Sequence, residues 1–184
     1  LMICPMDTRP SIHWTDHKYF KSSRGCLVTT FLHITNRRTQ YRSSLPSIDT
    51  MAESYQSSHY DHSIPDVSKP FDLRCPDNTD LWRIPPSTDR GNTPHIYRTI
   101  PASDFKSAKV TVSGPWTVLY DQGGLCMIID IPGAQQNKWV KTGIEMLNGK
   151  PRVSVVGTDT WSDWSLHPVV AADKVSATIE MIVE

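Results

Sequence analysis

The segment KWVKTGIEMLNGKPRVSVVGT, residues 138–158, decides the fold. Within it, Asn148-Gly149 separates two stretches rich in apolar and β-branched residues. Asn-Gly between such stretches is the strongest short-range signal for a β-hairpin. We therefore predict a strand at Lys138–Leu147 that turns at this dipeptide and pairs with a second strand at Lys150–Thr158.

The segments on both sides of this hairpin have the same texture. Phe105–Ser113 alternates between polar and apolar residues, as does Val175–Val183, and Thr117–Tyr120 leads into an apolar strand at Leu125–Ile131. Gly, Pro, Asn and Asp separate these segments, and none has an apolar period of 3.6 residues. From Asp66 onward the sequence predicts an all-β domain, an antiparallel β-sandwich or jelly roll rather than a barrel.

The last predicted strand runs to Glu184 without a closing turn. A sandwich of this kind needs more strands than residues 66–184 provide. We therefore expect a sandwich that is truncated at its C-terminus and that exposes a half-hydrophobic edge.

Residues 1–50 differ in composition from the rest of the chain. They hold seven Lys and Arg against three Asp and Glu, and only Gly25–Ile34 is apolar enough for a strand. We interpret residues 1–50 as a non-domain extension, possibly translated upstream sequence, with a basic disordered arm as the alternative. Met51 would then be the natural start, residues 51–65 a polar leader, and residues 66–184 the first part of the sandwich.

Charge and cysteine content exclude several classes of protein. The net charge is zero, which removes the general electrostatic case for nucleic acid or an acidic membrane. Four scattered cysteines form no zinc or CxxC motif, and Cys126 lies in an apolar run that predicts a small buried hydrophobe. No apolar stretch is long enough to span a bilayer or form a signal peptide. We expect a soluble cytoplasmic protein without cofactor, metal, nucleic-acid partner or membrane partner.

Three polar motifs are the candidates for function, and the first is Tyr120-Asp121-Gln122-Gly123-Gly124. Paired glycines after an acid and an amide mark a place where the backbone must come close to something. A bulge or a tight strand entry explains them without a ligand, and Gln122 at the edge of a binding site is the alternative.

The second motif is the strand segment Trp139–Glu145. Alternate residues of a strand share a face, so Trp139, Lys141 and Glu145 form one row, and Ile144 and Met146 belong to the opposite, core-facing side. The row could bind a sugar by stacking on the Trp ring and hydrogen bonding to the charges. The alternative is a structural Lys–Glu pair covered by the Trp.

The third motif, Trp161-Ser162-Asp163-Trp164-Ser165, follows a strand and is interpreted as a loop. Asp163 could brace a turn through bonds to backbone amides, orient Lys141, or accept from a ligand. Packing is the favoured role for the two tryptophans. None of the three motifs resembles a Ser-His-Asp triad, and no alternation of acids like that of a retaining glycosidase is present.

At these motifs the chain resembles a known family. YDQGGL, WVKTGIE and SDWS, in this order and spacing, are similar to blocks of the domain-of-unknown-function family that includes the yeast regulation-of-enolase protein. DLWRIPP and the entry strand DFK match as well, so the resemblance covers about residues 81–183. It implies a concanavalin A-like lectin/glucanase sandwich but no established catalytic residues. Nothing in the family resembles residues 1–50.

These observations lead to a ranked expectation about function. The first hypothesis is a non-catalytic module that binds a carbohydrate, a sugar phosphate or another small polar ligand. Its site residues would be Gln122, Trp139, Lys141, Glu145 and Asp163. The alternative is a regulatory interaction partner of a metabolic enzyme, as the family name suggests. A carbohydrate-active enzyme with Glu145 or Asp163 as acid/base ranks third, and a second carboxylate at catalytic distance would support it.

Overall fold

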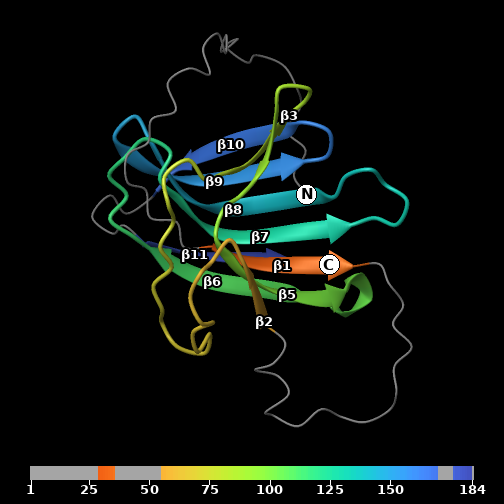
Figure 1. Cartoon of the computed structure of the whole chain (residues 1–184). Helices are drawn as coiled ribbons and strands as arrows, with labels where there is room; N and C mark the ends of the chain where they lie inside the picture. Colours follow the sequence, from red (N-terminus) through yellow and green to blue (C-terminus); the bar gives the residue numbers. More distant parts are fainter. Residues whose placement is uncertain (1–28, 36–54, 170–175, 184) are drawn as a thin grey trace.

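A computed structural model describes residues 29–35, 55–169 and 176–183 of the chain (Figure 1). This part is built almost entirely from strands, with one short 3₁₀ helix, η2, at Ala102–Asp104. The strands are β1 (Thr29–Thr35), β2 (Tyr55–Ser58), β3 (Leu81–Ile84), β4 (Thr88–Gly91), β5 (His95–Pro101), β6 (Ser107–Ser113), β7 (Gln122–Asp130), β8 (Lys138–Leu147), β9 (Lys150–Thr158), β10 (Ser162–Pro168) and β11 (Ser176–Ile182). The all-β prediction is therefore confirmed.

One large sheet dominates the architecture, with strand order β10-β9-β8-β7-β1-β5-β2. Figure 1 shows it in front of the two-stranded sheet formed by β6 and β11. Pairing is antiparallel throughout the described strands except at β1, which runs parallel to both β5 and β7. β1 overlaps Gly25–Ile34, the one potential strand that the sequence marked in residues 1–50, and ends one residue beyond it, at Thr35. The division of the chain into extension, leader and domain stays a prediction.

The β8–β9 hairpin forms with the predicted bounds. Asn148 and Gly149 both have positive φ, 52° and 71°, as a type I′ turn requires. Leu147 therefore pairs directly with Lys150, and the register continues to Trp139 opposite Thr158. This register fixes which face each side chain of the two strands occupies.

One face of β7 and β8 packs on the small β6–β11 sheet. Ile144 and Met146 of β8 form a buried cluster with Val112 of β6 and Trp116, which confirms their predicted place on the core side. β6 and β11 pair antiparallel, and the Ile182 side chain at the end of β11 is largely exposed.

The opposite face of the large sheet is covered by the β3–β4 hairpin. Cys126 and Trp139 are buried there in a second cluster, against which Trp82 of β3 and Trp164 of β10 pack. Cys126 is fully buried, as predicted. The row that starts at Trp139 thus lies under a hairpin, and this cover creates the enclosed space described below.

Arg83 fastens the β3–β4 hairpin to the sheet. Its Nε lies 3.0 Å from Asp89 Oδ1, within the hairpin, and its Nη1 donates to the carbonyl oxygens of Asn137 (2.8 Å) and Asp159 (3.3 Å). The Arg83 side chain is only 6% exposed. It joins strand β3 to the two loops that flank β8 and β9, and so it holds the cover over the sheet.

The structure corrects the interpretation of SDWS. This segment is not a loop: it begins strand β10, which pairs antiparallel with β9. Thr117–Tyr120, which leads into β7, contains a turn in which Tyr120 has a positive φ of 69°. The reason is Asp121, whose Oδ2 accepts from the backbone nitrogens of Thr117 (2.9 Å) and Val118 (2.8 Å). The bracing of a turn suggested for Asp163 therefore belongs to Asp121.

Candidate functional site

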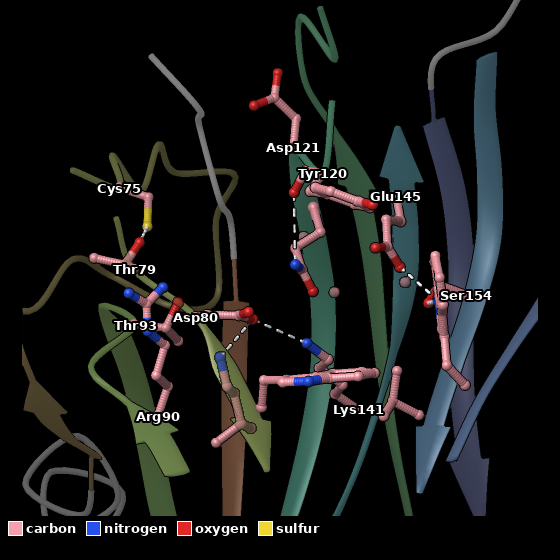
Figure 2. Close-up of a pocket in the computed structure, with 18 of the residues that line it drawn as sticks. Cys75, Thr79, Asp80, Arg90, Thr93, Tyr120, Asp121, Lys141, Glu145 and Ser154 are labelled. Atoms are coloured by element: carbon pink, nitrogen blue, oxygen red, sulfur yellow. Dashed lines mark hydrogen bonds and ion pairs between the residues drawn. The ribbon is translucent and has the colours of Figure 1, made fainter. Parts of the chain in front are cut away.

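A cavity of about 500 Å³ lies between the β3–β4 hairpin, the loop before it, and the face of β7, β8 and β9 that carries Lys141 and Glu145 (Figure 2). Its volume is in the range of small-molecule sites. The large sheet supplies the floor of the cavity, and the β3 side supplies its wall. Within the floor, strand pairing places Gln122 opposite Glu145 and Gly124 opposite Gly143.

Lys141 and Asp80 form the central ion pair of this cavity. Lys141 Nζ lies 3.3 Å from Asp80 Oδ1, and the two side chains are 15% and 17% exposed. Asp80 also accepts from the backbone nitrogen of Leu81 at 2.7 Å. The Lys141 ammonium lies 5.7 Å from the ring centroid of Trp82 and 5.9 Å from that of Trp139, within the range of cation–π attraction. Figure 2 shows the Lys141 and Asp80 side chains pointing toward one another.

Glu145 is the buried acid of the site, with 5% of its surface exposed. Its Oε2 accepts from the indole Nε1 of Trp164 at 3.0 Å, and it also hydrogen-bonds Ser154. Burial raises the pKa of Glu145 because the charged form loses its hydration, and the bonds to Ser154 and Trp164 and the charge of Lys141 only partly oppose this effect. Folding therefore disfavours ionisation of the Glu145 carboxyl group.

Aromatic rings wall the space beside these charges. Trp82 and Trp164 meet edge to face with centroids 6.4 Å apart, and Tyr120 meets Trp164 in the same way at 6.3 Å. Trp164 is held in place because its Nε1 also reaches Ser154 Oγ at 3.2 Å. Burial raises the pKa of Tyr120, and the nearby Glu145 charge adds to this effect.

A structural constraint explains Gly124 of the first motif. A Cβ on Gly124 would overlap the backbone of Thr142 and Gly143, and a Cβ on Gly143 would overlap the backbone of Gly123. The backbone comes close to the neighbouring strand here, as the tight-strand alternative expected. Gly143 also leaves a gap between Lys141 and Glu145 in the row that faces the cavity.

The structure brings three of the five proposed site residues together. Gln122, Lys141 and Glu145 all line the cavity. Trp139 does not: it is 2% exposed and packs in the core below the hairpin, so its ring reaches the site only through Lys141. Asp163 does not line it either, because β10 alternates and turns this exposed side chain to the face opposite Trp164.

Sequence reasoning missed much of the opposite wall. Asp80 and Trp82 come from the segment DLWRIPP, which had been noted only as part of the resemblance. Trp164 was assigned to packing, and it both packs and lines the cavity. The signal that could have identified Asp80 is its place directly before an apolar strand, but nothing local indicates that it faces Lys141, 61 residues away.

The described part of the chain shows neither a cluster of metal-binding side chains nor a membrane-spanning helix. Within residues 29–35, 55–169 and 176–183, no group of three or more His, Cys, Asp or Glu side chains is placed to hold a metal ion. The same part of the chain contains no helix that is long and apolar enough to cross a membrane.

Comparison with known proteins agrees with the resemblance seen in the motifs. An uncharacterised protein of Emericella nidulans is 45% identical over 114 residues, which are 62% of this chain and 56% of that protein. "Regulation of enolase protein 1" of Saccharomyces cerevisiae is 34% identical over 93 residues, 50% of this chain and 44% of that protein. The chain therefore spans about half the length of the curated relatives it matches. No solved structure shows a significant match.

The family comparison covers the cavity and the strands from β3 to β11. The model of the family described as "protein of unknown function (DUF1349)" matches residues 61–184. This range contains every strand from β3 to β11 and all residues that line the cavity. The chain belongs to the DUF1349 family.

Proposed function

We propose that the chain is a binding module whose cavity takes a small polar ligand, and that this ligand is a carbohydrate. The observation that carries the proposal is the meeting of aromatic rings and opposite charges in one enclosed space. Trp82 and Trp164 offer apolar surfaces beside the Lys141–Asp80 pair and Glu145. A sugar presents C–H faces that pack on rings and hydroxyls that both donate and accept hydrogen bonds, so it uses both kinds of surface.

Binding is favoured over catalysis by the way the carboxyl groups of Glu145 and Asp80 are held. Both residues line the cavity, together with three further acids. Asp80 is fixed by the Leu81 nitrogen and Lys141, and Glu145 by Trp164 and Ser154. Both acids thus have protein partners that orient them as recognition groups.

Isothermal titration with a panel of neutral mono- and disaccharides tests the proposal. We expect one site per chain and a Lys141→Met variant that binds at least about tenfold more weakly, because the cavity loses its ammonium and leaves Asp80 without its partner. Lys109→Met is the matched control, since Lys109 lies on β6 and pairs with Glu180 outside the cavity. A folded protein that binds no member of the panel, or a Lys141→Met variant with unchanged affinity, contradicts the proposal.

A second candidate is a regulatory partner of a metabolic enzyme. The observation that favours it is the name of the yeast relative, "Regulation of enolase protein 1". The match covers 44% of that protein. Biolayer interferometry of the purified chain against purified enolase tests this candidate. Saturable binding supports it, and no binding at micromolar concentrations of both proteins counts against it.

A further inference from the structure

The charges that line the cavity are unbalanced. Five of the residues that line the cavity are acidic, and two are basic, Lys141 and Arg90. The acids are Asp77, Asp80, Asp89, Asp121 and Glu145, and the carboxyl group of Asp121 is held by backbone nitrogens of its own turn. Arg83 pairs with Asp89 from outside the lining, and the acids still exceed the cations by two when Arg83 is counted. The lining therefore carries an excess of acidic residues, which favours cations over anions near it, although the whole chain has a net charge of zero.

The central cation of the cavity is already engaged. Lys141 pairs with Asp80 and lies over the rings of Trp82 and Trp139. An anionic ligand would have to compete with Asp80 for this ammonium while it also approaches Glu145. Like charges in a partly buried space repel strongly, because water screens them poorly there.

Glu145 is placed to favour the opposite kind of ligand. Glu145 takes part in none of the ion pairs found among the described residues, and it hydrogen-bonds the neutral groups of Trp164 and Ser154. The carboxyl group of Glu145 lies within the field of Lys141 but forms no ion pair with it, so its ionised form gains from a ligand that donates hydrogen bonds or carries an ammonium. The negative faces of the neighbouring Trp82 and Trp164 rings favour the same ligands.

From these contacts we infer that the cavity selects its ligand by charge: it accepts uncharged or amine-bearing polyhydroxy compounds and rejects phosphorylated or carboxylated ones, with Glu145 as the residue that sets this preference. The inference rests on the proposed function and narrows it, since it removes sugar phosphates from the ligands that the sequence suggested. Because the inference concerns the electrostatics of the site, the preference of the cavity for cations over anions can be measured without any sugar.

Three probes with the same ring, glucosamine, glucose and glucose 6-phosphate, test the selection by isothermal titration at low salt. We expect glucosamine to bind at least as tightly as glucose, and glucose 6-phosphate to bind about tenfold more weakly or worse. Glu145→Gln keeps the shape of the side chain and an acceptor for Trp164. It should reduce the differences in affinity between the three probes. Glu180→Gln removes a carboxylate from β11, outside the cavity, and should leave the differences in affinity between the probes unchanged. Glucose 6-phosphate that binds as tightly as glucose overturns the inference.

A measurement without sugar separates this inference from the proposed function. Iodide and caesium quench tryptophan fluorescence on contact, and Trp82 and Trp164 line the cavity. The Glu145→Gln variant should be quenched more by iodide and less by caesium than the wild type, and Glu180→Gln should show no such change. If this holds and none of the three sugars binds, the carbohydrate proposal fails while the charge preference stands. Equal quenching of wild type and Glu145→Gln by both ions overturns the preference itself.

Discussion

Replacement of Arg83 by methionine should destabilise the domain by about 3 kcal/mol. Methionine keeps much of the unbranched stem and removes only the guanidinium. The variant loses the bond to Asp89, the bonds to the carbonyl oxygens of Asn137 and Asp159, and a bond from Nη2 to Asn137 Oδ1 at 3.3 Å. Each bond to a charged group contributes about 1.5–3 kcal/mol.

The full sum of these bonds overestimates the loss, for a reason visible in the structure. Asp89 is 48% exposed on its side chain, so water takes over part of the role of the guanidinium. The buried part of the loss falls on the Asn137 and Asp159 carbonyl oxygens, which become unsatisfied when water cannot reach them. We therefore place the effect at the lower end of the range for breaking a buried ion pair.

Urea denaturation followed by tryptophan fluorescence measures this effect. With a slope of about 2 kcal/mol per molar urea, a loss of about 3 kcal/mol lowers the midpoint by about 1.5 M. Arg90→Met is the matched control, because Arg90 lies on β4 in the same hairpin with an exposed side chain, and it should shift the free energy of unfolding by no more than about 0.5 kcal/mol. If Arg83→Met lowers stability by less than about 1 kcal/mol, the hairpin is not fastened by this residue.

The remaining predictions concern the site and its frame. Gly143→Ala should destabilise the protein by about 2 kcal/mol or more in urea, because the new Cβ meets the backbone of the neighbouring strand, whereas Gly157→Ala, with nothing within 4 Å, should be nearly neutral. Burial raises the pKa of Glu145, so the folded chain holds a proton that the unfolded chain releases, and stability should fall as the pH rises from the unfolded pKa through the folded one. Glu145→Gln should remove this pH dependence of the urea midpoint, and parallel curves for the two proteins would contradict the assignment. Asp163→Asn should leave ligand affinity in titration calorimetry unchanged, since Asp163 lies outside the cavity, and a weaker affinity would show that β10 contributes its other face.

The strands were predictable where local signals agree. Asn148 and Gly149 determine a type I′ turn, and this turn fixes β8 and β9 to the residue. Alternation then places Lys141 and Glu145 on one face and Ile144 on the other, without any knowledge of what covers either face. Prediction failed at SDWS, which was interpreted as a loop and begins β10, because its pairing with β9 depends on a backbone path that residue preferences do not specify.

By itself, the sequence determined the fold class, the central hairpin and the row of residues that faces the site, because these follow from spacing along one or two strands. Only the tertiary structure decided that Asp80 meets Lys141 and that Trp82 and Trp164 wall the same space, since these contacts join segments far apart in the chain. It also decided that Trp139 is core and Asp163 outside the cavity. Alternation gives a side chain its face, but the layer that packs on this face decides whether it becomes core, site or surface.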